Sequence, residues 1–130
     1  MILVDTHVVV WLAFEPSQLS AKAKAAIDGA RRNGKGLAIC DITLLELTML
    51  SRKSRIRLNV SLESFLTEVE ARFIVLPITG RACVRALDLP DAYPGDPADR
   101  VIGATALVEG LPLLTADRQI RRSRAVPTIW

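Results

Sequence analysis

Short apolar runs alternate with helix-length segments along this chain, and this alternation constrains its fold more than any other feature. Strands are predicted at residues 2–5, 37–40, 73–76 and 112–115, with an edge strand at 126–130. Continuous Val/Ile/Leu-rich runs are typical of strands that are buried on both faces, as in parallel sheets. Helices are predicted at 7–14, 21–33, 42–53, 61–71, 79–88 and 97–109, with a helical turn at 118–122. The pattern therefore predicts an α/β fold, a three-layer α/β/α sandwich with a mostly parallel central sheet.

Local signals support several of these boundaries. Ser20 is placed to cap the helix over 21–33, and Gly34 and Gly36 follow its end. Proline is tolerated at the first residue of a strand and in edge strands, which suits Pro112 and Pro127.

Size and composition limit the class of protein. A chain of 130 residues is long enough to bury a core, and we predict one domain over 1–130. No apolar stretch approaches the ~20 residues that span a bilayer. The apolar start carries Asp5 and His7 and lacks the basic segment of a signal peptide. Cys40 and Cys83 show no disulfide or zinc spacing. We therefore expect a cytoplasmic protein with no membrane segment.

Four acids end or interrupt apolar runs, where a carboxylate is costly unless it is compensated: Asp5, Glu46, Asp99 and Asp117. Functional groups of parallel α/β folds gather at the carboxyl ends of the strands. Asp5 and Asp117 fall at or just past such ends. Glu46 and Asp99 are predicted in the first turns of helices that start at the same edge. Mg²⁺, or alternatively Mn²⁺, would compensate the repulsion of such a cluster, because both ions bind carboxylate oxygens.

Each acid also has a local explanation. Thr43 and Glu46 fit a capping box at a helix start. Asp96 fits an N-cap, with Asp99 in the first helical turn. The other two acids fit cap or turn positions. These roles explain the residues singly, but none explains why four acids should meet at one edge of a sheet.

The chemistry that such a cluster supports is phosphodiester hydrolysis, because a bound metal activates water and stabilises developing charge. A net charge of +3 and a pI near 9.2 suit a polyanionic partner. The basic residues cluster at Arg31, Arg32 and Lys35, at Arg52, Lys53, Arg55 and Arg57, and at Arg118, Arg121, Arg122 and Arg124. These clusters also suit solvated helix ends.

Three further residues are accessory candidates. The hydroxyls of Thr6 and Thr115 are placed either to orient a neighbouring carboxylate or metal-bound water, or to close backbone turns. Arg100 follows Asp99 directly, and it is either a phosphate contact or a solvated helix residue.

Four stretches of the chain resemble, in order and spacing, the successive motifs of the PIN-domain family, and more narrowly of the VapC-type toxins of bacterial toxin–antitoxin pairs. The stretches are Met1–His7, Thr43–Glu46, Asp96–Ala106 and Leu113–Arg118. The four motifs in register are more specific than any one of them. Ala98 is smaller than the residue that the family often has at this position. This difference removes none of the residues that could bind a metal.

The resemblance implies a Rossmann-like fold and a Mg²⁺-dependent endoribonuclease that acts on RNA, is often a homodimer and is inhibited by a cognate antitoxin. The residues that match the family's acidic quartet, as catalytic and metal-binding residues, are Asp5, Glu46, Asp99 and Asp117. Asp96 matches an accessory acid. His7 is expected in a helix-surface or capping role and not as a catalytic base.

Excess apolar surface suggests a partner. Leu62, Phe65 and Leu66 form a helical stripe. Together with the helix that carries Leu44 to Leu50, this stripe is predicted to frame a groove for a helix or strand of the antitoxin. Trp11, Phe14 and the Leu/Val face of 8–12 are expected in the core or at a partner surface.

Other α/β functions fit less well. A phosphatase of the haloacid dehalogenase type needs a second Asp where His7 stands, and a receiver domain needs a late lysine, but none follows Lys53. The glycine-rich turn of a dinucleotide-binding domain is absent. The remaining alternative is a non-catalytic subunit that acts with an antitoxin as a co-repressor on DNA.

Overall fold

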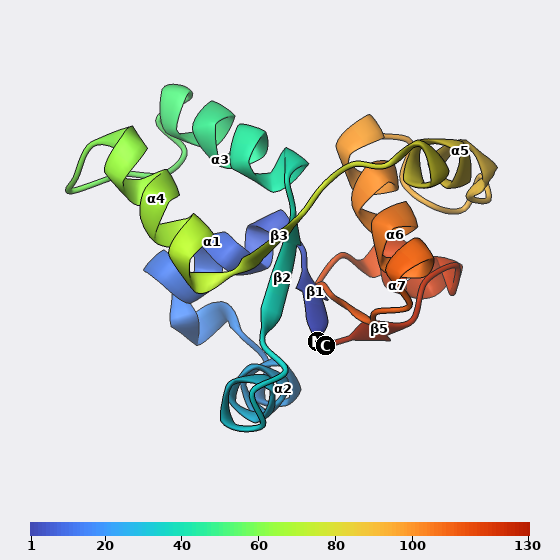
Figure 1. Ribbon diagram of the computed structural model, residues 1–130, viewed down its shortest axis with the longest axis horizontal. Helices are drawn as coiled ribbons and strands as arrows, with labels where there is room; N and C mark the ends of the chain where they lie inside the picture. The colour runs from blue at the N-terminus through green and yellow to red at the C-terminus, as the bar shows by residue number, and fades with distance from the viewer.

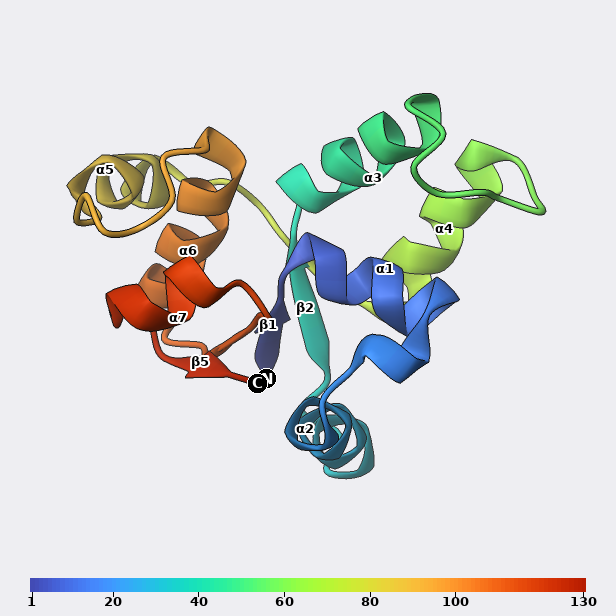
Figure 2. The same ribbon diagram turned by 180° about the vertical axis from the view of Figure 1, so that it is seen from behind.

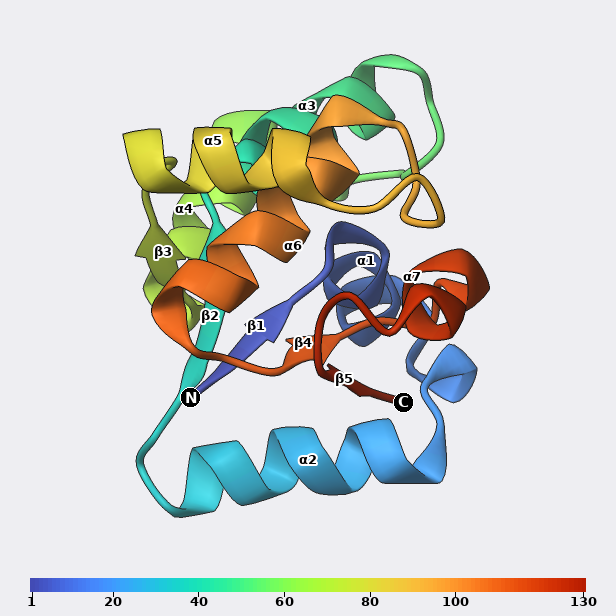
Figure 3. The same cartoon turned by 90° about the vertical axis from the view of Figure 1, so that its right-hand side faces the viewer.

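The computed structural model describes residues 1–130 and confirms the predicted fold class (Figure 1). The strands are β1 (Ile2–Val4), β2 (Leu37–Cys40), β3 (Ile74–Leu76), β4 (Leu113–Leu114) and β5 (Thr128–Ile129). They form one sheet in the order β3-β2-β1-β4-β5, seen from left to right in Figure 3, and every neighbouring pair is parallel. The predicted edge strand is confirmed, because β5 lies outside β4.

Helices cover both faces of the sheet. They are α1 (Thr6–Phe14), α2 (Ala21–Arg32), α3 (Ile42–Arg52), α4 (Leu62–Arg72), α5 (Gly80–Asp88), α6 (Pro97–Glu109) and α7 (Arg118–Ser123), with a short 3-10 helix, η1 (Pro16–Gln18). Figures 1 and 2 show α1 and α4 on one side of the sheet, and α5, α6 and α7 on the other. None of these helices has the length and apolar composition needed to cross a lipid bilayer.

The apolar runs are explained by burial on both faces of the strands. Successive strand residues point to opposite faces. Leu3 and Leu113 pack with residues of α6 and α7, whereas Val4 and Leu114 pack with residues of α1, α2 and α4. All four side chains are at most 1% exposed. Neither face of the sheet therefore tolerates the polar alternation of a half-exposed strand.

Several boundaries differ slightly from the prediction. Ser20 caps α2 as predicted, with its hydroxyl accepting from the amide of Ala23 at 3.0 Å. The strand predicted at 2–5 ends at Val4, because Asp5 is the N-cap of α1. The turn η1 was not predicted, and the strand predicted at 112–115 is limited to β4.

Candidate functional site

The sheet and the helices that follow its strands place the four acids. Asp5 directly follows β1, and Asp117 caps α7, where its carboxylate accepts from the amide of Ile120 at 2.9 Å. Asp99 lies in the first turn of α6, as predicted. Glu46 was predicted in the first turn of its helix, but it lies in the second turn, since α3 begins at Ile42, almost immediately after β2.

The capping box predicted at Thr43 and Glu46 is wrong. Thr43 is buried inside α3, and the N-cap position belongs to Asp41. Glu46 is instead held from another helix, because the Thr6 hydroxyl donates to its Oε1 at 2.6 Å. The hydroxyl of Thr43 lies 3.0 Å from that of Thr6. A hydroxyl has one proton to donate, so Thr43 donates to Thr6 while Thr6 donates to Glu46.

Asp5 is the most constrained of the acids. It is 3% exposed, and its Oδ1 accepts from the amide of Thr6 at 2.9 Å. Its Oδ2 accepts from the Thr115 hydroxyl at 2.8 Å. The same hydroxyl accepts from the amide of Asp117 at 3.1 Å. Thr115 therefore connects the carboxylate that follows β1 with the backbone of the acid that follows β4.

The imidazole of His7 makes a second connection between these two segments. Its Nε2 accepts from the amide of Ala116 at 3.0 Å, so in the neutral ring the proton is on Nδ1. Nδ1 lies 3.6 Å from Oδ2 of Asp5. The sequence indicated only a surface or capping role for His7, because its contact with Ala116 joins residues that are 109 positions apart.

Electrostatics show that the acids act on one another. The pKa of Asp99 is raised to about 7, first by burial and then by repulsion from other carboxylates. Those carboxylates are Asp5, Asp96, Glu46 and Asp117. Burial also raises the pKa of Glu46, although the hydrogen bond from Thr6 opposes the shift. The other four acids are therefore close enough to Asp99 to disfavour its charged form.

Asp96 is an exposed member of this group. It is the N-cap of α6, as predicted, and its carboxylate accepts from the amide of Asp99 at 3.1 Å. This bond uses one carboxylate oxygen, so the other is available at the same edge of the site.

Arg100 is not a solvated helix residue, because its guanidinium is hydrogen-bonded to backbone carbonyls, and its contact with a phosphate stays a prediction that these bonds do not favour. Its Nη1 donates to the carbonyls of Ala86 and Leu89 at 3.1 and 3.0 Å. Its Nη2 donates to those of Pro90 and Tyr93 at 3.3 and 3.4 Å. The guanidinium therefore binds the end of α5 and the loop after it, where it supplies donors to backbone carbonyls at a helix end. Of the four carbonyls, that of Pro90 also accepts from the amide of Tyr93 at 2.9 Å.

Sequence reasoning missed Tyr93. The side chain is 1% exposed, and its hydroxyl donates to the backbone carbonyl of Asp99 at 3.0 Å. Burial and the nearby carboxylates raise the pKa of this phenol, so it keeps its proton. The ring packs directly against Gly103 of α6. A glycine inside a predicted helix was the one available signal of such a close approach.

The donor set suits a hard divalent cation. As the side chains stand, no group of three or more His, Cys, Asp or Glu residues is arranged to hold a metal ion. Mg²⁺ does not require such a cage, because it keeps several waters and is commonly bound through one or two carboxylates. Mutually repelling carboxylates, with a raised pKa at Asp99, fit that kind of site.

Comparison with known proteins places the chain in a family. The family model of the PIN domain matches residues 2–125. Ribonuclease VapC22 of Mycobacterium tuberculosis is 37% identical over 131 residues, which cover 99% of this chain and 98% of that protein. The chain belongs to the PIN domain family.

Solved structures show the same fold. VapBC2 from Rickettsia felis, bound to a DNA fragment from its promoter, gives a TM-score of 0.72 at 18% identity, over 98% of this chain and 97% of that one. DNA-bound VapBC from Salmonella typhimurium gives 0.69 at 21% identity, over 98% and 97%.

Proposed function

We propose that this protein is a metal-dependent endoribonuclease and the toxin of a toxin–antitoxin pair. The observation that carries the proposal is the convergence of five acids at one edge of the sheet, where burial and the repulsion of the other four raise the pKa of Asp99 to about 7. Membership of the PIN domain family and the 37% identity to a protein named as a ribonuclease support the same activity. A cluster of this kind is unfavourable without a cation, and a divalent ion would turn repulsion into binding.

The site residues have distinct roles in this proposal. Those that hold Mg²⁺, or alternatively Mn²⁺, and carry catalysis are Asp5, Glu46, Asp99 and Asp117, with Asp96 as an accessory acid. When bound, the ion supplies an activated water and stabilises charge on the reacting phosphate. Thr6 orients Glu46, and Thr115 orients Asp5, through the hydrogen bonds described above.

The first test is cleavage of total cellular RNA by purified protein free of antitoxin. We expect discrete cuts with Mg²⁺ and none with EDTA, because phosphodiester hydrolysis at this site needs the ion. Restoring Mg²⁺ after EDTA should restore cleavage and excludes irreversible damage. Cuts that persist in EDTA would contradict the proposal, as would a folded protein that binds Mg²⁺ and cleaves no RNA.

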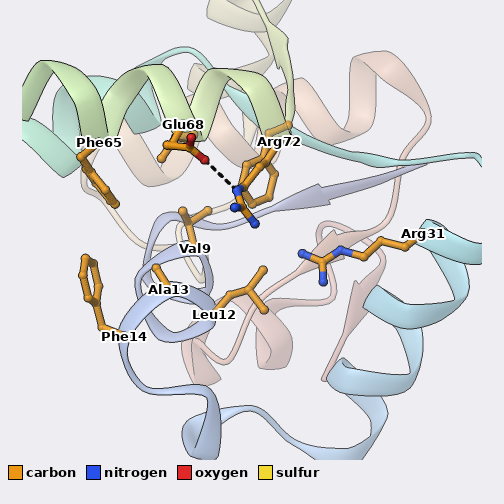
Figure 4. Close-up of a pocket in the computed structure, with 10 residues that line it drawn as sticks. Val9, Leu12, Ala13, Phe14, Arg31, Phe65, Glu68 and Arg72 are labelled. Carbon is orange, nitrogen blue, oxygen red and sulfur yellow. Dashed lines mark hydrogen bonds and ion pairs between the residues drawn. The ribbon is translucent and has the colours of Figure 1, made fainter. Parts of the chain in front are cut away.

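The proposed antitoxin site is a groove between α1 and α4, with a volume of about 460 Å³ (Figure 4). Phe65 lines it, as predicted, but the opposite wall is α1 and not the α3 segment from Leu44 to Leu50. The two walls meet where the rings of Phe14 and Phe65 lie 5.6 Å apart. The ion pair of Arg72 with Glu68 provides a polar edge. An apolar floor with a charged edge fits the apolar face of an amphipathic helix.

Charge placed in this groove should weaken antitoxin binding. Phe14 is 39% exposed, so Phe14→Glu should leave the core intact. We expect at least about a tenfold loss of affinity for the antitoxin encoded by the neighbouring reading frame, because an aromatic anchor is lost. The matched control is Leu87→Glu on α5, where Leu87 is 83% exposed. Equal affinities of the two variants would show that the antitoxin binds elsewhere.

The co-repressor role remains the second candidate, because the solved structures with this fold include DNA-bound VapBC complexes. The two roles are compatible, and only the nuclease requires the acids. The homodimer stays a prediction.

A further inference from the structure

The C-terminal helix α7 presents a hollow that is lined only by arginines. Its volume is about 430 Å³, and its lining residues are Arg118, Arg121, Arg122 and Arg124. All four are exposed, and none takes part in either of the two ion pairs in the structure. None donates a side-chain hydrogen bond to another part of the protein, in contrast to Arg100.

The arrangement follows from the sequence of α7. Arg118, Arg121 and Arg122 have the i, i+3, i+4 spacing of one helix face. Ile120, on the opposite face, is 1% exposed and anchors the helix to the core. Gln119 adds a hydrogen bond to the carbonyl of Ala92 at 3.3 Å. The arginine face is therefore held toward solvent by a fixed helix.

This face is electrostatically unfavourable without a ligand, because like charges at i, i+4 repel one another and destabilise a helix. The other hollows that contain arginines differ, because Arg81 and Arg85 share theirs with Asp88, and Arg31 shares the antitoxin groove with Glu68. The α7 hollow is the one among them without a carboxylate, so an anion from outside the chain is the natural partner.

We propose that the α7 hollow binds backbone phosphates of the RNA strand whose scissile phosphate lies at the acidic site. This inference rests on the proposed ribonuclease function. Asp117, one of the site acids, is the N-cap of α7. The helix has six residues, so it spans about 9 Å at 1.5 Å per residue. The acids repel phosphate when no metal is bound, so a nearby cationic surface would hold the flanking strand and fix its position.

The test measures binding separately from cleavage. The parent is the Asp99→Asn variant in EDTA, and the probe is a fluorescent single-stranded oligouridylate titrated at several NaCl concentrations. Arg121→Gln with Arg122→Gln removes two charges from the hollow and leaves Arg118, beside Asp117, unchanged. Arg81→Gln with Arg85→Gln is the matched control, because it removes the same charge from α5.

We expect the α7 double variant to bind roughly tenfold more weakly at fixed salt, and the control to bind like the parent. The slope of log affinity against log salt should fall by about 0.7 for each phosphate that is no longer neutralised, or about 1.4 for two. An unchanged slope, an equal loss in the control, or a parent that binds no RNA would overturn the proposal. So would a loss confined to antitoxin binding, which would assign the hollow to an acidic segment of that protein.

Cleavage of RNA by the protein with Asp99 intact tests the proposed ribonuclease function separately from RNA binding by the α7 hollow. Mg²⁺-dependent cuts together with an unchanged salt slope would refute the α7 site and leave the nuclease standing. Absence of both cleavage and RNA binding would refute both.

Discussion

Replacing Asp99 with asparagine is expected to reduce Mg²⁺-dependent RNA cleavage by more than about a hundredfold while the protein stays folded. Loss of a residue that merely orients a metal ligand typically costs about 10–100-fold, so loss of a ligand charge should cost more. Asparagine has nearly the same shape, and the Tyr93 hydroxyl binds the backbone carbonyl of Asp99, which the substitution keeps. Cleavage rates of a defined RNA, with circular dichroism as a folding check, measure the effect.

The control for this variant is Asp28→Asn. Asp28 is exposed on α2, outside the group of acids that shifts the pKa of Asp99. The Asp28→Asn variant should cleave RNA at the rate of the unmodified protein. Retained cleavage in the Asp99 variant would remove this residue from the proposed metal site, and loss of cleavage accompanied by unfolding would leave it a structural role only.

The Asp99→Asn variant should also be more stable than the unmodified protein when no metal is present. The pKa of Asp99 rises from its ordinary value of 3.8 to about 7 in the folded protein. Between these values only the folded state keeps the proton, so this group's contribution to the free energy of unfolding falls as the pH rises from about 4 to 7. Asparagine has no such dependence. In EDTA near pH 8 we expect a gain of about 1–2 kcal/mol, discounted for partial exposure, that shrinks toward pH 5 in urea unfolding.

The sequence predicted the elements well, because each depends on a local pattern. Strands that are buried on both faces require continuous apolar runs, and helix starts such as that of α2 carry their capping residue. The order of the strands was not predictable in this way. It depends on which parallel edges pair across long connections, and no short stretch of sequence records that choice.

The candidate acids were chosen because each ends or interrupts an apolar run. Asp41 shows that this criterion is not sufficient to identify a site residue. This residue follows β2 just as Asp5 follows β1. Its Oδ2 accepts from the amide of Ile78 at 3.2 Å, and its Oδ1 lies 3.7 Å from the thiol of Cys40. Asp41 therefore stabilises the segment after β3 and is not among the acids that shift the pKa of Asp99. An acid at the end of a strand looks the same in either role.

The supporting contacts were the least predictable part of the site. The contacts of Arg100 were not predicted because its partners are backbone carbonyls, which exist at every residue and leave no trace in side-chain patterns. Tyr93 acts through the carbonyl of Asp99 in the same way. Such contacts become visible only when the loop and α6 are placed in space.

The contact of Tyr93 with Gly103 leads to the largest expected effect on stability. A Cβ at position 103 would overlap the Tyr93 hydroxyl and lie 2.7 Å from Cζ of the ring. Alanine normally favours a helix over glycine by about 1 kcal/mol, whereas overpacking a core costs about 1–3 kcal/mol and occasionally more. Since the ring is buried and has no free space, we expect Gly103→Ala to lose about 2 kcal/mol net in urea unfolding. Gly29→Ala on α2, where nothing lies within 4 Å, should instead gain up to about 1 kcal/mol.

A double-mutant cycle with Tyr93→Phe tests whether this contact is the cause. Tyr93→Phe alone should cost about 1 kcal/mol, because the carbonyl of Asp99 loses its donor. Combined with Gly103→Ala it should cost clearly less than the sum, by about 1 kcal/mol, because the overlapping hydroxyl is gone. Strict additivity would show that Gly103 is needed for another reason.

Because Tyr93 holds the backbone of Asp99, Gly103→Ala should also slow Mg²⁺-dependent cleavage at temperatures where it remains folded, whereas Gly29→Ala should not. That difference would separate displacement of the acidic site from a general loss of stability.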